Sequence, residues 1–423
     1  MNSAIAKIYG TAQSPEAYEV RDFLARSNLP YEWTELRTDE EARAIGVSDL
    51  SDARLPMCVL GEATVLYRPT IVDLAGALDW FGTPKLPEYD LVICGAGPAG
   101  LSAAVYAASE GLKTVLLERS AIGGQAGSTS RIENYLGFPD GISGWELATR
   151  ARRQAQRLGA EIIVGLEGLG CEYRGTLIVG YLTGGVRVAS RAVICATGVE
   201  YTRLGLPEEE RFLNKGLYYG AGPSEAALCS DHVFIVGGGN SAGQAALHFA
   251  EHAAKVTLLV RGEQLCATLS TYLLERIEQS PRIEVCTESV LKTLEGTDSL
   301  TAITYEIGPG KGEYRAETRS VFVCIGGRPR TDWAEPGTLR TDRAGYILTG
   351  NELADVDLPP ILWDGSRRPM QREASLPGFF IAGDVRHNSI KRFATAVGEG
   401  AIAVSMVHQY LAMLRNGERA YRY

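Results

Sequence analysis

The chain has 423 residues, of which 45% are apolar and 22% are charged, as in a globular protein large enough for two or three domains. Its 51 aspartates and glutamates outnumber its 42 lysines and arginines, so the formal net charge is -9. This balance argues against a nucleic-acid partner, because no excess of cations is present to displace the counterions of a phosphate backbone.

Nothing in the sequence indicates export or membrane insertion. The first residues, MNSAIAKIYGTAQ, contain no long apolar core of the signal-peptide kind, and no run of 18 apolar residues occurs. We therefore expect a cytoplasmic protein with no membrane partner. Of the eight cysteines, the closest two, Cys266 and Cys286, are 20 residues apart, which excludes a C-x-x-C redox motif and zinc-site spacing. Several lie in apolar runs such as LVICG and VFVCIGG, which predicts buried thiols.

Residues 1–82 have the pattern of a small α/β unit. IAKIYG predicts a strand, and a helix is expected to begin at Pro15 with Ser14 as its N-cap. YEWTEL predicts a second strand, ARLPMCVL and ATVLYR two further strands in a hairpin, and TIVDLAGALDWFG a closing helix. The segment GTPKLPE contains two prolines and a glycine, so we expect a linker at residues 83–88.

From Tyr89 the chain uses one plan twice, about 142 residues apart: a buried strand, a glycine turn, an Ala-rich helix and a second strand. In the first copy, Gly95, Gly97 and Gly100 form G-x-G-x-x-G. These glycines permit a tight turn, backbone approach to a pyrophosphate and close packing of the helix on the strand. Glu118 ends the next strand, where a carboxylate accepts hydrogen bonds from ribose hydroxyls. The pattern predicts a dinucleotide site.

The second copy has Gly237, Gly239 and Ala242 as G-x-G-x-x-A after the strand VFIV. Here Arg261 closes the following strand, where the first copy has Glu118. A cation at this place favours the 2′-phosphate of NADPH, whereas an acid would favour the free 2′-hydroxyl of NADH. We therefore expect NADPH, with NADH as the alternative.

Three further segments accompany these turns: IGGQAGSTSRIENYLGFP, CATG and FFIAGDVRHNSIKRFATAVGEGAIAV. With them, residues 89–423 resemble the flavoproteins that have two dinucleotide-binding domains, specifically the low-molecular-weight thioredoxin-reductase-like group. The resemblance implies FAD, with Gln125 and Asn134 near the flavin and Asp384 on the ribityl chain. It also implies a helix starting near Phe393, whose N–H groups face the flavin edge that becomes anionic on reduction.

The residues that the two turns and this resemblance predict to bind FAD and the nicotinamide coenzyme are Gly95, Gly97, Pro98, Ala99, Gly100, Glu118, Arg119, Gly124, Gln125, Asn134, Thr197, Gly198, Asp384, Lys391, Arg392, Phe393, Gly237, Gly239, Asn240, Ser241, Ala242 and Arg261.

One departure from the group concerns the coenzyme. In the group, the strand before Arg261 leads into H-R-R-x-x-x-R, but this chain reads VRGEQLC and keeps one arginine. The choice between NADPH and NADH therefore stays open.

A second departure concerns sulfur. Thioredoxin reductases carry C-A-T-C shortly before the second glycine turn, and the matching residues here are Gly220, Ala221, Gly222 and Pro223. Dithiol exchange needs one thiolate to attack and another to resolve, and these residues supply neither. The resemblance therefore implies a flavoprotein that is not a self-contained thioredoxin reductase.

The N-terminal unit shows the same loss. Residues 3–82 resemble a glutaredoxin/thioredoxin-type domain, with Pro56 in the place of the cis-proline of that fold. Where glutaredoxins have C-P-Y-C, this chain has Ser14-Pro15-Glu16-Ala17, and a serine hydroxyl does not replace a low-pKa thiolate. We expect a docking or dimerisation module; the alternative is a module that recruits a thiol-bearing partner to the flavin.

No catalytic side chain is assigned beyond the flavin itself. His387, shortly after Asp384, is a candidate general acid or a surface-loop histidine. In ferredoxin–NADP reductases of thioredoxin-reductase type a C-terminal aromatic ring covers the flavin, so Tyr423 or Tyr421 is a candidate for that role, with a frayed terminus as the alternative. His248 and His252 are four residues apart on a predicted helix, but no third ligand is evident at metal-site spacing, so we expect no metal.

The sequence thus predicts an α/β protein with two Rossmann-like dinucleotide-binding domains preceded by a small thioredoxin-fold domain. The domains are 1–82, the linker 83–88, an FAD domain of 89–206 with 334–423, and an NAD(P) domain of 207–333. The expected function is NADPH-dependent transfer of electrons from FAD to an unidentified external acceptor, a protein or a small molecule. The alternatives are a ferredoxin/flavodoxin–NADP reductase-like activity and a catalytically silent docking or redox-sensing flavoprotein. The resemblance also implies a homodimer.

Overall fold

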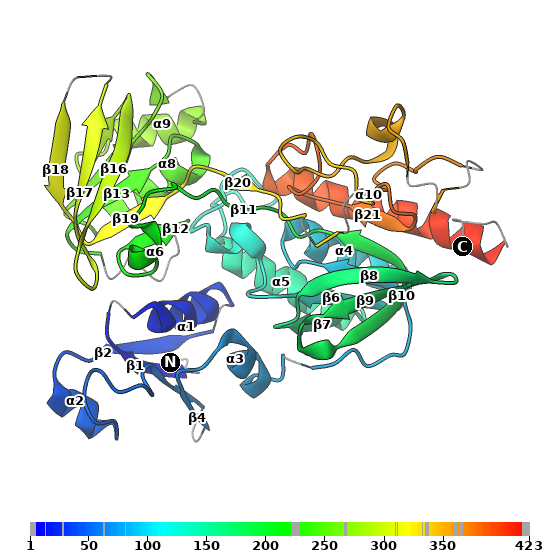
Figure 1. Ribbon diagram of the computed structural model, residues 1–423, viewed down its shortest axis with the longest axis horizontal. Coiled ribbons are helices and arrows are strands. Elements are labelled where there is room, and N and C mark those ends of the chain that lie inside the picture. The colour runs from blue at the N-terminus through cyan, green and yellow to red at the C-terminus, as the bar shows by residue number, and fades with distance from the viewer. Residues whose placement is uncertain are drawn as a thin grey trace.

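The computed structural model describes residues 6–12, 14–27, 29–61, 64–80, 82–220, 229–265, 269–308, 310, 312–331, 333–334, 338–358, 362–363 and 367–416. Three units are visible in Figure 1: the N-terminal unit in blue, a second unit running from light blue to green that includes the red C-terminal helix, and a third in green and yellow. The two larger units contain parallel sheets flanked by helices, which confirms the predicted α/β class with two Rossmann-like folds.

The N-terminal unit has a four-stranded sheet in the order β2-β1-β3-β4, in which β1 is parallel to β2 and antiparallel to β3. Its elements are β1 (Ala6–Gly10), α1 (Pro15–Arg26), β2 (Tyr31–Glu35), α2 (Asp39–Ala44), β3 (Met57–Leu60), β4 (Thr64–Tyr67) and α3 (Ile71–Ala77). As predicted, Ser14 caps α1 by accepting from the Ala17 N–H at 3.1 Å, and Pro15 is the first helical residue. The peptide bond before Pro56 is cis, also as predicted. The sequence reading missed α2, whose capping box pairs Thr38 with Glu41.

The second unit begins after residues 83–88, which form no helix or strand. Its sheet has the order β7-β6-β5-β10-β9-β8, with β21 added beside β10. The central strands are parallel, and β8, β9 and β10 form an antiparallel meander. Its elements are β5 (Tyr89–Cys94), α4 (Pro98–Ser109), β6 (Thr114–Glu118), η1 (Gly124–Ser128), α5 (Gly144–Arg157), β7 (Glu161–Val164), β8 (Gly168–Arg174), β9 (Leu177–Leu182), η2 (Thr183–Gly185), β10 (Arg187–Cys195), η4 (Gly350–Leu353), β21 (Phe379–Ile381) and α10 (Phe393–Arg415).

The third unit has a parallel sheet in the order β12-β19-β13-β14-β15 and a three-stranded antiparallel sheet, β16-β17-β18. Its elements are α6 (Glu209–Phe212), β12 (Leu217–Tyr219), β13 (His232–Val236), α8 (Asn240–Ala250), β14 (Lys255–Leu259), α9 (Thr271–Glu278), β15 (Ile283–Cys286), β16 (Ser289–Gly296), β17 (Leu300–Ile307), β18 (Glu313–Glu317) and β19 (Ser320–Val323). The chain enters and leaves through β11 (Glu200–Tyr201) and β20 (Gly327–Arg328), which pair antiparallel as a narrow ribbon between the units.

The N-terminal unit contacts both other units. The Arg152 guanidinium on α5 lies 4.3 Å from the Trp80 ring, and the Val164 N–H donates to the Trp80 carbonyl at 2.9 Å. On the other side, the rings of Tyr18 on α1 and Tyr218 on β12 are 5.0 Å apart. Helix α1 therefore faces the junction of all three units, as Figure 1 shows.

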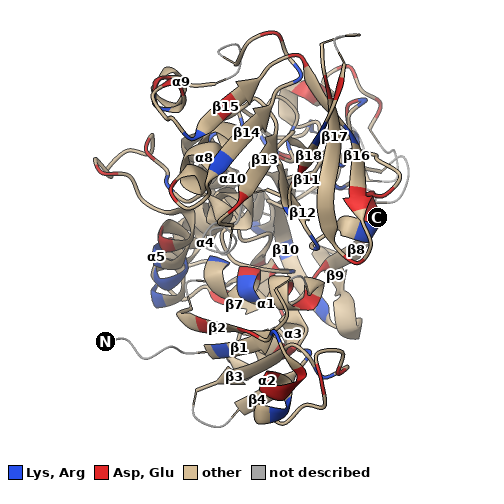
Figure 2. Ribbon diagram, turned by 90° about the vertical axis from the view of Figure 1, so that its left-hand side faces the viewer, with Lys and Arg blue, Asp and Glu red and all other residues tan. Residues whose placement is uncertain are grey.

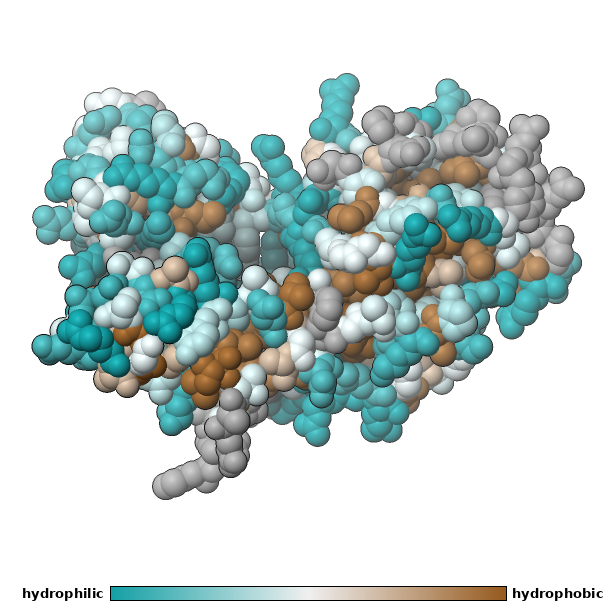
Figure 3. Space-filling model, turned by 60° about the horizontal axis from the view of Figure 1, so that its bottom comes forward, coloured by the Kyte–Doolittle hydropathy of each residue, from teal (hydrophilic) through white to brown (hydrophobic). Residues whose placement is uncertain are grey.

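The surface carries charges of both signs, with basic residues gathered along α5 (Figure 2). Figure 3 shows that the apolar side chains on the face formed partly by the N-terminal unit are interrupted by polar ones. Val65, Tyr67 and Val72 of the N-terminal unit are among the exposed large apolar residues. Within the described part of the chain, no helix combines the length and apolar character needed to cross a membrane.

Candidate functional site

A cavity of about 720 Å³ opens where the three units meet. It brings together most residues that the sequence predicted to bind a dinucleotide: Gly95, Gly97, Pro98, Ala99, Glu118, Arg119, Gly124, Gln125, Asn134, Thr197, Gly198, Asp384, Lys391, Arg392, Phe393, Asn240 and Ser241. The helices that follow the two glycine turns, α4 and α8, thus both begin at this cavity. Five predicted residues are outside its lining: Gly100, Gly237, Gly239, Ala242 and Arg261.

The first glycine turn is packed on one side and open on the other. Gly95 has φ +103°, and a Cβ there would lie 2.5 Å from the Ala196 carbonyl oxygen. A Cβ at Gly100 would overlap the Gly95 carbonyl oxygen, so this glycine brings α4 against the turn. A Cβ at Gly97, the N-cap of α4, would meet nothing within 4 Å. The backbone at Gly97 is therefore open to a ligand at the positive end of the α4 dipole.

Glu118 is held beside this turn with 7% of its surface exposed. One carboxylate oxygen accepts from the Ala96 N–H at 2.7 Å and the other from the Ser120 N–H at 2.9 Å. The neighbouring Arg119 instead forms ion pairs, with its Nη1 2.7 Å from Glu200 Oε1 and 3.4 Å from Glu167 Oε1. The carboxylate is thus fixed at the cavity wall and keeps lone pairs for hydroxyl donors.

The opposite wall is formed by Asp384 and the start of α10. Burial raises the pKa of the Asp384 carboxyl, although the Lys391 ammonium acts in the opposite direction. Arg392 is the N-cap of α10 and makes no side-chain capping bond, so the first N–H groups of the helix from Phe393 on have no side-chain cap. This confirms the predicted helix start at Phe393.

A buried ion pair supports the Asp384 loop from behind. The Glu399 carboxylate, 3% exposed, accepts from the Gly383 N–H and from Arg386 Nη2, both at 2.8 Å. Arg386 also contacts Glu352 at 3.4 Å. Because α10 carries Glu399, this network ties the loop before Asp384 to that helix.

The second glycine turn reaches the cavity through the start of α8. Asn240 and Ser241 line the cavity together with Gln244, and Asn240 Oδ1 also accepts from the Ser270 N–H at 2.8 Å. Gly237 is packed on the sheet, because a Cβ there would overlap the Cys324 carbonyl oxygen. Arg261 is exposed after β14 and has no ion-pair partner among the described residues. The structure therefore places Arg261 outside the cavity lining.

Tyr201 lines the cavity from strand β11. Its ring lines the main cavity and an adjoining one of about 100 Å³, which Gly220 and Cys324 also line. Gly220 has φ +81°, and a Cβ there would overlap Tyr201 Oη. Burial raises the pKa of the Tyr201 hydroxyl, so it stays protonated at neutral pH. Residues 221–223, the rest of the stretch that is predicted to match C-A-T-C, are outside the described residues.

Sequence reasoning missed one whole wall of the cavity. Tyr18, Asp22 and Arg26 of α1 line it, although they belong to the N-terminal unit. Their spacing of four residues places them on one face of α1. That spacing is visible in the sequence, but nothing there indicates which neighbour the face meets.

The candidate catalytic residues do not gather in the cavity. His387 Nδ1 pairs with Asp342 Oδ2 at 2.8 Å, and His387 is absent from the cavity lining. Tyr421 and Tyr423 are outside the described residues.

The cysteines are separate from the cavity as well. Cys58, Cys94, Cys171, Cys195, Cys229, Cys286 and Cys324, the cysteines that the structure describes, are all free, and none lines the main cavity. A second cavity of about 320 Å³, under the β8–β10 meander, is lined by Cys94, Cys171 and Cys195. Burial raises the pKa of Cys94 and of Cys195, which makes them poor nucleophiles.

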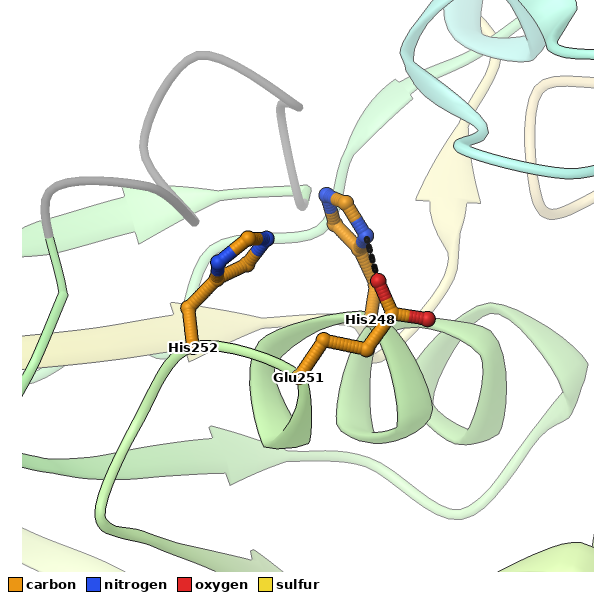
Figure 4. Close-up of side chains that lie close together, drawn as sticks. All are labelled: His248, Glu251 and His252. Atoms are coloured by element: carbon orange, nitrogen blue, oxygen red, sulfur yellow. Dashed lines mark ion pairs between the residues drawn. The ribbon is translucent and has the colours of Figure 1, made fainter.

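His248 on α8 and His252, just after the end of that helix, have a third potential ligand beside them. Glu251 comes close to His248 and His252 at the C-terminal end of α8, with their ligand-type atoms within 4.8 Å of one another (Figure 4). The expectation that no third potential ligand accompanies these histidines is therefore wrong. His248 Nδ1 is 4.0 Å from the Glu251 carboxylate, whose side chain is 66% exposed. Glu251 and His252 are exposed and His248 is half-buried, and none of the three lines the main cavity, so we assign this cluster no part in the site.

Comparison with known proteins agrees with this geometry. The family model described as pyridine nucleotide-disulphide oxidoreductase matches residues 89–400. The chain is 31% identical over 334 residues to a thioredoxin reductase of Treponema pallidum, which covers 78% of this chain and 99% of that one. It is 31% identical over 333 residues to a thioredoxin reductase of Bacillus subtilis, covering 77% and 96%. The crystal structure of Lactococcus lactis thioredoxin reductase superposes with a TM-score of 0.67 at 28% identity, covering 77% of this chain and 99% of that one. By its sequence and by the arrangement of its two dinucleotide-binding folds, this chain belongs to the pyridine nucleotide-disulphide oxidoreductase family.

Proposed function

We propose that this protein is an NADPH-dependent FAD oxidoreductase that passes electrons to an acceptor outside the polypeptide, without an internal dithiol. The observation that carries the proposal is the cavity of about 720 Å³ that Gly97, Asp384 and Ser241 line together. Transfer between two dinucleotides requires both binding turns to face one space, because the reacting atoms must come within contact distance.

The residues of the second unit fit FAD. Gly97 leaves its backbone open at the start of α4, which suits a pyrophosphate, and the Glu118 carboxylate is fixed where ribose hydroxyls would reach it. Across the cavity, Asp384 would hold the ribityl chain, and the start of α10 offers N–H groups to the flavin edge. Bound there, FAD would supply two-electron chemistry: a hydride accepted from a reduced nicotinamide, and two electrons given to a second acceptor.

We assign the third unit to the nicotinamide coenzyme and prefer NADPH. Arg261 follows β14 on the exposed side of the second glycine turn and has no ion-pair partner among the described residues, so its charge is available to a 2′-phosphate. For a coenzyme held by the third unit and an external acceptor to reach the same flavin ring, the β11–β20 ribbon would act as a hinge about which the third unit rotates.

The proposed electron path avoids sulfur. No described residue of the main cavity is a cysteine, and Gly220 begins the stretch that aligns with the missing C-A-T-C. The nearby Cys324 lines only the small adjoining cavity, and burial raises its pKa to about 12. A thiol with that pKa is protonated at neutral pH and does not start thiol exchange. Electrons would therefore leave directly for an external acceptor.

We also propose that the N-terminal unit is a glutaredoxin-like domain without redox cysteines. Its strand order, the cis peptide bond before Pro56 and the capping of α1 by Ser14 support this reading. Ser14 and Ala17 occupy the cysteine positions of that fold. A docking role within the chain fits the contacts of α1 with both larger units.

Anaerobic addition of NADPH to the FAD-loaded protein tests the proposal. We expect the visible absorbance of the flavin to bleach, and we expect sustained NADPH oxidation when ferricyanide or a small quinone is added. Alkylation of accessible thiols should leave this turnover unchanged. If neither NADPH nor NADH bleached the flavin, the proposal would be overturned in favour of a docking or sensing flavoprotein.

A further inference from the structure

The wall of the cofactor cavity formed by α1 lies outside the region that the family model matches, which begins at residue 89. Helix α1 presents Tyr18, Asp22 and Arg26 to the cavity at intervals of four residues. The Tyr18 ring lies against Tyr218 of the third unit, with their centroids 5.0 Å apart. Asp22 and Arg26 are further along the helix, toward the second unit.

The Arg26 guanidinium is anchored but has unused hydrogen-bonding capacity. Its Nη2 donates to the Gly124 carbonyl at 2.9 Å, and its Nη1 donates to Asp22 Oδ2 at 3.3 Å. Its Nε is buried and has no hydrogen-bond partner among the described residues. Each terminal nitrogen carries a second N–H beyond these two bonds, and because Arg26 lines the cavity these groups can donate to a bound anion.

The anchor places this cation beside the first glycine turn. A Cβ at Gly124 would lie 3.1 Å from Gly97 Cα, so the residue whose carbonyl holds Arg26 packs directly on the N-cap of α4. Gly97 and Arg26 line the same cavity. The proposed place of the FAD diphosphate is therefore next to both the α4 start and the guanidinium.

We propose that Arg26 of the N-terminal unit binds the diphosphate of FAD, so that this unit is a constitutive wall of the cofactor site. The inference rests on the proposed function, because it takes FAD to occupy the cavity. The chemistry is that of a guanidinium, whose several donors match phosphate oxygens, added to the N–H groups of the α4 start. Asp22 holds the guanidinium in place through its ion pair.

The test is the affinity of the full-length apoprotein for FAD, measured by quenching of flavin fluorescence. We expect Arg26→Ala to weaken FAD binding at least tenfold and Arg26→Lys to weaken it less. The control is Arg37→Ala, which removes an exposed arginine of the same unit that pairs with Glu35 at 2.8 Å. It should stay within twofold of the unaltered protein.

Competition by adenosine and by ADP separates contact with the diphosphate from a structural effect. We expect Arg26→Ala to weaken ADP as a competitor while leaving adenosine unchanged. An equal loss for both, or an unchanged FAD affinity, would overturn the inference. Should Arg26→Ala not fold, Arg26→Gln carries the same comparison. If the unaltered protein failed to bind FAD, the proposed function would fail; if it bound FAD and only the Arg26 effect were absent, the inference alone would fail.

Discussion

Tyr201 occupies the space into which a side chain at Gly220 would extend. A Cβ at Gly220 would overlap Tyr201 Oη and lie 2.7 Å from Cζ. The sequence resemblance predicts that Gly220 takes the place of the first cysteine of the thioredoxin-reductase motif, and the space for a side chain there is already filled. A cysteine at position 220 would therefore also require Tyr201 to move and the positive φ of this residue to change.

Gly220→Ala should destabilise the protein by about 2–4 kcal/mol, because positive-φ strain at a non-glycine residue of ~1–3 kcal/mol adds to the clash with Tyr201. The matched control is Gly398→Ala in α10, where a Cβ would meet nothing within 4 Å and helix propensity favours alanine. Chemical denaturation measures both. Equal stability of the two variants would contradict the packing of Tyr201 on Gly220.

Glu399→Ala should cost about 3–5 kcal/mol, because it leaves the Arg386 guanidinium buried without its closest carboxylate. It also releases the Gly383 N–H, so FAD affinity should fall through the loosened Asp384 loop. Glu399→Gln keeps the acceptor for Gly383 and should lose less affinity. An Ala variant with normal stability and normal FAD binding would show that the network does not support the loop.

Asp384→Asn should affect stability and binding in opposite directions. Burial raises the pKa of Asp384 in the folded protein, so ionisation of this carboxyl disfavours the folded state. The resulting loss of stability develops as the pH rises from the pKa of an unfolded aspartate, about 4, through the higher pKa of the folded protein. At pH 7 the neutral asparagine variant of the apoprotein should therefore melt at a higher temperature, while at pH 3.5 the two should converge. FAD affinity should nevertheless decrease. A lower melting temperature of the variant at pH 7 would contradict this.

Arg261→Ala should raise the KM for NADPH by about 10–100-fold, the loss expected for one charge-assisted contact to a phosphate, and leave the KM for NADH unchanged. Lys292→Ala, which removes a cation of β16 that pairs with Glu306 on β17, is the control for net charge. Steady-state kinetics with an artificial acceptor measures both constants. An equal fold-change in the KM for both coenzymes would contradict a contact between Arg261 and the 2′-phosphate.

The sequence predicted what depends on local chemistry. The two glycine turns, the start of α1 at Pro15 and the start of α10 at Phe393 each follow from residues within one turn of the feature, and the structure confirms them. Most of the residues that motif and resemblance assign to cofactor binding do meet in one cavity, from Gly95 to Phe393.

The sequence did not predict what depends on contacts between units. Arg26 reads as a surface residue at the end of an amphipathic helix until the packing of α1 places it at Gly124, 98 residues away. The filling of the Gly220 space by Tyr201 depends likewise on the path of the β11–β20 ribbon. Conversely, Arg261 satisfies the local pattern of a phosphate site, yet it lies outside the cavity lining. The orientation of the third unit relative to the second depends on contacts between units, which the local sequence does not determine.

The most direct measurement is the number of electrons that the protein accepts per bound flavin in an anaerobic titration with dithionite. A flavin alone takes up two electrons, and a flavin with a redox-active disulfide takes up four. We predict two electrons per FAD, with every cysteine titrating as a free thiol before and after reduction. An uptake of four would show a dithiol in communication with the flavin and would contradict direct electron transfer to an external acceptor.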